Sequence, residues 1–163
     1  MAKTKIMVFT EGTLIMHPGA KGHSGGLPVF RLFNYSLSVR DYKNYIPIGN
    51  CVEKLKKWVK QGAEIVYLTS RRKPKEIKMI QGILDKYEFP KGKLLHREGD
   101  ENYNDVAERV IPDILIEDDC ESIGGEKEMT ITFVKPEIKR KIKSICVKEF
   151  GGIDHLPDDF HKL

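Results

Sequence analysis

Two patterns of apolar and polar positions alternate along most of this chain, and each pattern predicts a different kind of secondary-structure element. Short apolar runs of strand length lie at 6–9, 63–70, 93–97 and 113–119. Between them, apolar residues recur every three or four positions, as in amphipathic helices, at 50–62, 73–90 and 104–112. Further along, residues 128–135 alternate like a strand, and residues 135–145 carry isoleucines at helical spacing.

The alternation of strand and helix predicts an α/β fold in three layers. A doubly wound, mostly parallel sheet is expected between two layers of helices, because the central strands are apolar throughout and such strands are buried on both faces. The 163 residues suit one domain with a sizeable core, so residues 1–163 are expected to form a single domain.

Residues 15–47 depart from this alternation of strand and helix patterns and are expected to form a small inserted cap above the sheet. Glycine and proline open the segment, and aromatic residues with arginines fill the rest. Two uses of those side chains remain open: stacking on a nucleotide base with Arg31 and Arg40 at its phosphates, or packing into a small core of the insertion. The aromatic residues concerned are Phe30, Phe33, Tyr35, Tyr42 and Tyr45. His17 and His23 are either polar loop residues or catalytic or metal-binding groups.

Composition narrows the class of protein. The sequence is 40% hydrophobic and 32% charged, as in soluble globular proteins. Its apolar runs are too short to cross a membrane, and no signal-peptide pattern is present, so a cytoplasmic protein is expected. The three cysteines form no C-x-x-C pair, which indicates neither a disulfide framework nor a zinc site. The net charge of +4 suits an anionic ligand, but nucleic acid is not expected, because the basic segment 135–143 has the isoleucine stripe of an ordinary amphipathic helix.

Polar residues follow three of the predicted strands at the point where each strand ends. In an open parallel sheet, ligands bind beyond the carboxyl ends of the strands, so these groups are expected to share one crevice. Carboxylates there suit a hard cation such as Mg²⁺, and hydroxyl and amide groups at a strand-to-helix turn suit a phosphate. The groups are Thr10, Glu11, Gly12 and Thr13; Thr69, Ser70, Arg71 and Arg72; and Glu117, Asp118 and Asp119.

These three stretches resemble motifs of the haloacid dehalogenase superfamily, most of whose members are Mg²⁺-dependent phosphohydrolases. "VFTEGTL" resembles the first motif, which is Asp, any residue, Asp, Gly, Thr. "VYLTSR" resembles the second motif and "DILIEDD" the fourth, and the three occur in the family's order. The resemblance covers nearly the whole chain outside residues 15–47. It implies a HAD-like fold with a cap at that insertion, a bound Mg²⁺ and a small phosphorylated ligand.

The sequence departs from the family pattern at two of its motifs. Phe9 stands where the family has its nucleophilic aspartate, and a shift of one residue puts Thr10 there instead. Neither side chain can form the family's aspartyl-phosphate. Glu11 stands where the family has its general acid/base aspartate. The third motif's lysine is absent from residues 101–110, and four cations remain as candidates for its role: Lys73, Lys75, Lys93 and Arg97.

The resemblance and the residue chemistry together give a candidate site. Glu11 and Thr10 are the catalytic candidates, and the metal candidates are Glu117, Asp118 and Asp119. The phosphate-binding candidates are Thr69, Ser70, Arg71 and Lys73. Each group also has a purely structural alternative: a solvated acidic turn, a helix N-cap, a turn carboxylate beside Gly12, or a surface ion pair.

Two functions follow from this site. The first is a divergent phosphate-ester-handling protein that hydrolyses slowly, with Mg²⁺ and with Glu11 acting on a water molecule. The second is a non-catalytic module that binds a phosphorylated metabolite or nucleotide. Retention of the acidic cluster favours the first function, and the missing nucleophile favours the second.

Overall fold

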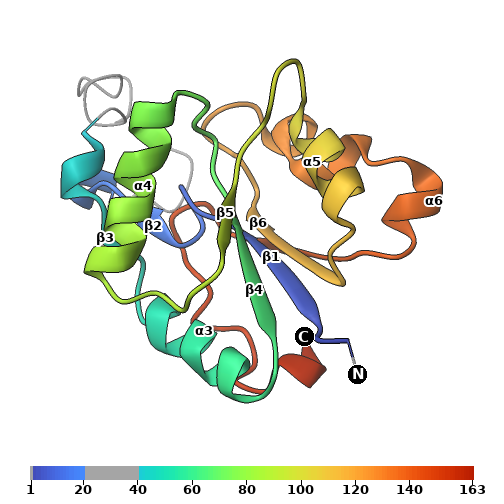
Figure 1. The fold of residues 1–163 in the computed structure, drawn as a ribbon, viewed down its shortest axis with the longest axis horizontal. Coiled ribbons are helices and arrows are strands. Elements are labelled where there is room, and N and C mark those ends of the chain that lie inside the picture. Colours follow the sequence, from blue (N-terminus) through green and yellow to red (C-terminus); the bar gives the residue numbers. More distant parts are fainter. Residues whose placement is uncertain (1, 21–40) are drawn as a thin grey trace.

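The structure, a computed structural model, describes residues 2–20 and 41–163. Most of the predicted cap lies outside the described residues, including His23, Arg31, Arg40 and the aromatic residues at 30, 33 and 35. A five-stranded parallel sheet forms the centre of the molecule, in the order β5-β4-β1-β6-β7 (Figure 1). Its strands are β1 (Lys5–Phe9), β4 (Glu64–Leu68), β5 (Lys93–Leu95), β6 (Ile114–Asp118) and β7 (Lys143–Val147).

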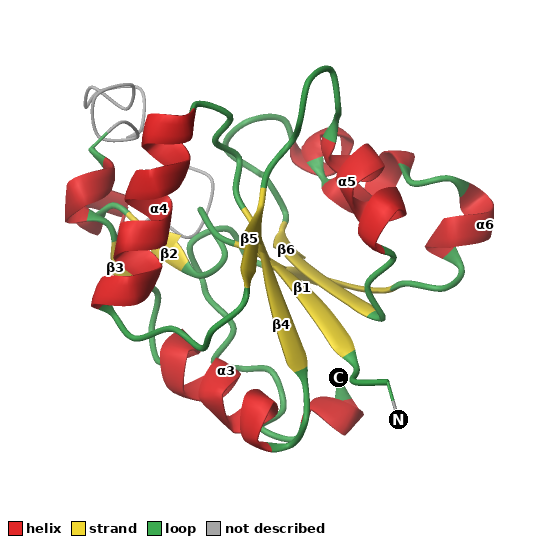
Figure 2. Ribbon diagram, viewed as in Figure 1, coloured by secondary structure: helices red, strands yellow, loops and turns green. Residues whose placement is uncertain are grey.

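Helices cover both faces of the sheet, which confirms the expected three-layer α/β fold (Figure 2). One layer holds α3 (Cys51–Lys60) and α4 (Pro74–Lys86), and the other holds α5 (Tyr103–Val110) and α6 (Pro136–Lys139). A small antiparallel pair, β2 (Ile15–Met16) with β3 (Ile46–Pro47), lies beside α4. Short 3-10 helices complete the described chain: η1 (Pro18–Ala20), η2 (Tyr42–Asn44), η3 (Gly125–Glu128), η4 (Thr130–Phe133) and η5 (Phe160–Lys162). Within the described ranges, no helix combines the length and apolar character that a membrane span requires.

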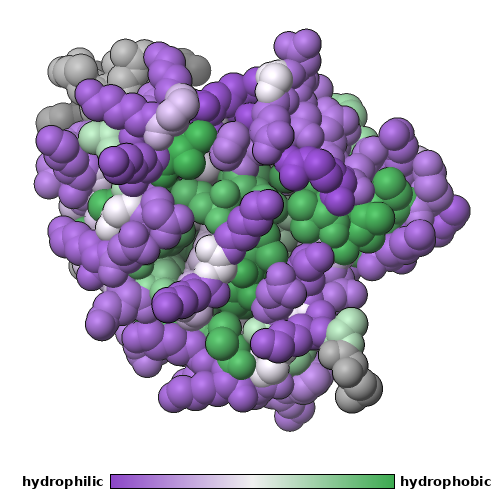
Figure 3. Space-filling view, viewed as in Figure 1, coloured by the Kyte–Doolittle hydropathy of each residue, from purple (hydrophilic) through white to green (hydrophobic). Residues whose placement is uncertain are grey.

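The period of two along each strand divides the core between the two faces of the sheet. Ile6 and Val8 of β1 join the cluster that includes Leu55 and Trp58 of α3. Met7, between them, joins the cluster on the α5 side. Because both faces are covered, every position of such a strand must be apolar, and this explains the uninterrupted apolar runs in the sequence. In Figure 3, hydrophobic side chains also show in the hollow between α4 and α5, along the edge strand β5.

Two elements near the C-terminus differ from the sequence prediction. The strand expected at 128–135 is wrong: this segment forms η3 and η4, and the backbone N–H groups of Thr130 and Ile131 donate to the side chain of Glu117 rather than to a neighbouring strand. The helix expected at 135–145 ends at Lys139, and the edge strand β7 begins at Lys143. Alternation in so short a segment does not specify a strand when a buried carboxylate offers its N–H groups another acceptor.

Residues 153–163 pack against α3. Ile153, Phe160 and Leu163 belong to the same buried cluster as Trp58. The indole Nε1 of Trp58 donates to the carbonyl oxygen of Pro157 at 3.0 Å. In Figure 1 this last segment ends beside the start of the chain, so the first and last parts of the sequence share one core.

Candidate functional site

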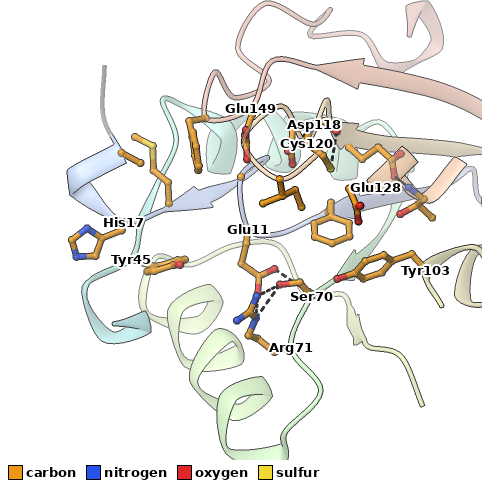
Figure 4. A pocket seen from close by; sticks show the side chains of 18 of the residues that line it. Glu11, His17, Tyr45, Ser70, Arg71, Tyr103, Asp118, Cys120, Glu128 and Glu149 are labelled. Atoms are coloured by element: carbon orange, nitrogen blue, oxygen red, sulfur yellow. Dashed lines mark hydrogen bonds and ion pairs between the residues drawn. The ribbon is translucent and has the colours of Figure 1, made fainter. Parts of the chain in front are cut away.

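A cleft of about 310 Å³ opens at the carboxyl ends of the central strands. The chain runs outward from β1 to β4 and β5, then crosses back to β6, so the strand order reverses between β1 and β6. A crevice at this switch point is where open parallel sheets bind ligands. Figure 4 shows Asp118 and Glu149 on one side of the cleft, with Glu11, Ser70 and Arg71 on the other.

A tight turn after β1 forms the floor of the cleft. The carbonyl oxygen of Thr10 accepts from the backbone N–H groups of Leu14 and Ile15, at 2.8 and 3.0 Å. Gly12 has a φ of +84°, and a Cβ atom at this position would lie 3.0 Å from a carboxylate oxygen of Asp118. Thr13 Oγ1 donates to that same carboxylate at 2.7 Å. Glycine is therefore needed here both for the left-handed backbone and for the close approach of β6.

The carboxylate of Glu11 is held by donors from two strand ends. It accepts hydrogen bonds from Thr69 Oγ1 at 2.6 Å and from the backbone N–H of Ser70 at 3.2 Å, and also from the Thr10 hydroxyl. The Arg71 Nε lies 3.6 Å from it. The sequence-predicted catalytic pair and three of the predicted phosphate-binding residues are thus in one group, with the carboxylate at its centre.

Arg71 is fixed in place beside Glu11. Its Nη1 donates to the hydroxyl of Tyr42 at 2.6 Å, and its Nε donates to Ser70 Oγ at 2.9 Å. Tyr42 and Tyr45 are themselves buried in the main core, so these two aromatic residues of the predicted cap region serve as packing residues. Lys73 does not line the cleft: it precedes α4 and is exposed.

Three carboxylates converge on the opposite side. Asp118, Asp119 and Glu149 each offer an oxygen, and these oxygens lie within 4.8 Å of one another. Burial raises the pKa of Asp118 to about 6. Lys148 Nζ lies 3.6 Å from an oxygen of Asp119, so one cation already stands beside the group. A set of oxygen donors from carboxylates fits a hard cation such as Mg²⁺.

Glu117 lies apart from this cluster although it is the next residue to Asp118. Successive side chains of β6 point to opposite faces, so Glu117 faces the α5 side of the sheet. Its two oxygens accept from the N–H groups of Thr130 and Ile131, at 3.0 and 3.3 Å. Burial raises its pKa to about 7. The structure therefore groups Asp118 and Asp119 with Glu149 and gives the carboxylate of Glu117 two backbone partners.

An arginine and two aromatic rings complete the side of the cleft nearest α5. The guanidinium of Arg97 lies 4.1 Å from the centre of the Tyr103 ring, and its Nη2 donates to the carbonyl oxygen of Ser70 at 3.0 Å. The Phe9 ring meets the Tyr103 ring edge-on, at 5.2 Å between ring centres. Of the four cations considered for the third motif's lysine, Arg97 lines the cleft, whereas Lys73, Lys75 and Lys93 do not.

His17 also lines the cleft, at the end away from Tyr103. Its Nδ1 accepts from the backbone N–H of Gly19 at 3.0 Å, and its Nε2 lies 3.6 Å from a carboxylate oxygen of Asp41. These contacts place it in a polar loop at the rim of the cleft.

Sequence reasoning missed Glu149, because it follows an edge strand that the sequence pattern had placed inside a helix. The neighbouring Phe150 donates its backbone N–H to the carbonyl oxygen of Gly12 at 2.8 Å, and this bond brings the loop to the cleft. The Glu149 N–H also donates to Asp119 Oδ1 at 3.2 Å. The short apolar run Ile145–Val147 was the available signal for β7, and an assignment of this strand would have drawn attention to the turn that contains Glu149.

The described fold is similar to those of solved phosphatases and an RNA repair protein. A class C acid phosphatase from Bacillus anthracis aligns over 93% of this chain and 70% of its own, with a TM-score of 0.57 and 15% identity. The same enzyme with tungstate bound gives a TM-score of 0.56 at 13% identity, over the same shares of the two chains. A chain of the Pnkp1/Rnl/Hen1 RNA repair complex aligns over 89% of this chain, with a TM-score of 0.56 and 15% identity.

These likenesses show the fold alone: a parallel sheet between two layers of helices, as the sequence pattern predicted. This chain spans 42% of the length of the RNA repair chain that it matches. No protein-family model matches the sequence, and no curated protein matches it.

Proposed function

We propose that the cleft binds a phosphate ester together with Mg²⁺. The observation that carries this proposal is the placement of two complementary groups in one cleft. One side is lined by Asp118 and Glu149, which cluster with Asp119. The other side is lined by Ser70 and Arg71, which follow Thr69. Bound Mg²⁺ would neutralise charge on a phosphate and orient it. Asp118, Asp119 and Glu149 would hold the cation, and Arg71 and Arg97 would bind the phosphate oxygens.

Hydrolysis in this site would proceed by direct attack of water. By the sequence alignment, Phe9 or, with a shift of one residue, Thr10 stands where the family has its nucleophile. Phe9 packs against Tyr103, and neither side chain can form an aspartyl-phosphate. Glu11 is the carboxylate that lies among the phosphate donors, so it is the group placed to orient a water molecule or accept its proton. Such general-base help is worth roughly 10²–10⁴-fold, so the reaction is expected to be slow.

Binding without hydrolysis is the second candidate, and the contacts of Glu11 favour it. A carboxylate that accepts from Thr10, Thr69 and Ser70 is engaged by the protein itself. A base held in this way is less available to water.

Two assays test these proposals on the wild-type protein. Calorimetric titration of ribose 5-phosphate and AMP, with Mg²⁺ and with EDTA, should show binding that depends on the metal. Arg97→Gln should weaken that binding about tenfold, whereas Arg140→Gln, at an exposed position of the basic segment, should leave it unchanged. Binding of neither ester under any condition would refute the proposal.

Release of inorganic phosphate then separates the two candidates. If the protein hydrolyses, activity should be lost in Glu11→Gln while Mg²⁺-dependent binding persists. A wild type that binds an ester and releases no phosphate is a binding module.

A further inference from the structure

The cleft is larger and more apolar than a phosphate and a metal ion require. Besides its charged groups, the walls of the cleft are formed by Phe9, Met16, Tyr45, Tyr103, Ile123 and Phe150. Its volume of about 310 Å³ falls at the lower end of the range for small-molecule sites. An inorganic ion would leave these walls uncovered, so the ligand should carry an apolar body beside its phosphate.

A second hollow lies next to the cleft on the α5 side. The two hollows share Arg97, Tyr103 and Glu128 as lining residues, so they are direct neighbours. Phe133 of η4 lines this second hollow, together with side chains of mixed character: Asn102, Asn104, Lys127 and Met129. Amides and a cation around an aromatic ring suit a flat, polar group better than an aliphatic chain.

Exposed hydrophobic side chains mark the same region. Phe133 is 63% exposed and Ile123 is 56% exposed, the highest values among the large hydrophobic residues that stand out on the described surface. Ile123 lines the cleft and Phe133 lines the hollow. A single exposed apolar residue needs no explanation, but two that line neighbouring hollows favour a contact surface for a ligand.

Arg97 stands where the two hollows meet and sets the orientation of the ligand. Burial is the main cause that lowers its pKa; Tyr103 acts in the opposite direction, and the nearby positive charges of Arg72 and Arg71 lower the pKa further. Arg97 Nε is buried and has no hydrogen-bond partner within the described structure. A phosphate bound at this junction would be compensated by Arg97 and Arg71, and the rest of the molecule would point towards Phe133.

We propose that the ligand of this site is a nucleoside monophosphate, with its phosphate at Arg97 and Arg71 and its base against Phe133 in the second hollow. This proposal rests on the proposed function, because the phosphate end is the same. It adds that recognition depends on an aromatic base, and that a phosphate ester without such a base binds more weakly.

The test compares AMP with ribose 5-phosphate, which is the same molecule without its base. Calorimetry with Mg²⁺ should give an affinity for AMP at least tenfold higher than for ribose 5-phosphate. Phe133→Ala should reduce the AMP affinity about tenfold, since stacking of a base on an aromatic ring contributes in this range. The same variant should leave ribose 5-phosphate binding within twofold. Because Phe133 is largely exposed, its removal should not disturb the core.

Val59→Ala provides the matched control. Val59 is an exposed hydrophobic residue on α3, away from both hollows, and its truncation should change neither affinity. Equal affinity for AMP and ribose 5-phosphate would overturn the inference and leave the proposed function standing. A preference for AMP that survives Phe133→Ala would overturn the placement of the base. Failure of both ligands to bind the wild type would refute the proposed function and this inference with it.

Discussion

Thr69 Oγ1 donates a 2.6 Å hydrogen bond to the carboxylate of Glu11. These residues follow two neighbouring strands, β1 and β4, and the bond joins the first-motif turn to the second-motif turn. Together with the N–H of Ser70 and the guanidinium of Arg71, it makes a small anion-binding group that the protein fills with its own carboxylate. A phosphate that uses these donors must displace Glu11 or bind beside it.

Removal of the Glu11 carboxylate should therefore strengthen the binding of inorganic phosphate. In Glu11→Ala the donors from Thr69 and Ser70 lose their acceptor, and hydrogen bonds to a charged group contribute about 1.5–3 kcal/mol each. An increase in phosphate affinity of about tenfold or more is expected by calorimetry. Glu128→Ala is the control, since it removes one negative charge from the same cleft without freeing these donors. An equal gain in both variants would mean that only the net charge of the cleft matters.

The metal-binding prediction distinguishes Glu149 from Glu117. Asp118→Asn and Glu149→Gln should each weaken Mg²⁺ binding about tenfold or more, because each removes a carboxylate from the cluster. Glu117→Gln should change it less than about threefold, because Glu117 binds two backbone N–H groups instead. Mg²⁺-induced thermal shifts and calorimetry measure this. A loss of Mg²⁺ binding in Glu117→Gln and Asp118→Asn, but not in Glu149→Gln, would instead support the ligand set predicted from the sequence.

Stability should fall with rising pH because of Glu117. Its pKa is raised by burial from an ordinary value of 4.5 to about 7. Below pH 4.5 the group is protonated in both the folded and the unfolded chain. As the pH rises towards 7, the unfolded chain releases the proton while the folded protein keeps it, so the free energy of unfolding decreases, by roughly 3 kcal/mol at most.

Urea denaturation at pH 5 and pH 8 in EDTA measures this effect. Wild type should lose more stability between the two pH values than Glu117→Gln does. Glu137→Gln, at an exposed position on α6, should behave like wild type. Parallel pH dependences in all three proteins would show that Glu117 does not titrate in this range.

The turn at Gly12 should tolerate no side chain. Gly12→Ala would put a Cβ atom 3.0 Å from the carboxylate of Asp118 and would hold alanine at a φ of +84°. A left-handed conformation costs a non-glycine residue about 1–2 kcal/mol, and the close contact adds to this loss of unfolding free energy. Gly82→Ala in α4 is the control: a Cβ there meets nothing within 4 Å, so it should stabilise the helix by up to about 1 kcal/mol. Equal effects of the two substitutions would contradict the close packing of the turn against β6.

The sequence was sufficient to predict the fold because its strongest signals are local. The apolar runs and the helical stripes of α3, α4 and α5 follow from burial, and the motif order placed the cleft at the ends of β1, β4 and β6. The grouping of Glu11 with Thr69, Ser70 and Arg71 followed from the same topology. Glu117 shows the limit of this reasoning. It lies next to Asp118 and lines the same cleft, but adjacent strand residues face opposite ways, and its oxygens accept from two backbone N–H groups.

Contacts between distant segments were beyond the reach of sequence patterns. Glu149 is brought to the cleft by the backbone hydrogen bond from Phe150 to Gly12. No sequence pattern within residues 143–150 predicts that contact. Four cations were candidates for the role of the third motif's lysine, and Arg97, which follows β5, is the one of these four that lines the cleft. The 3-10 turns at 125–133 depend in the same way on the buried carboxylate of Glu117.

The packing of residues 153–163 against α3 has a consequence for how the chain folds during synthesis. Ile6 and Trp58 are made early, but their cluster is completed by Phe160 and Leu163. The cluster around the apolar face of α3 is therefore complete only once residues 153–163 have been synthesised and have left the exit tunnel. A nascent chain halted before residue 153 would expose that face, which makes it a natural point of contact for chaperones.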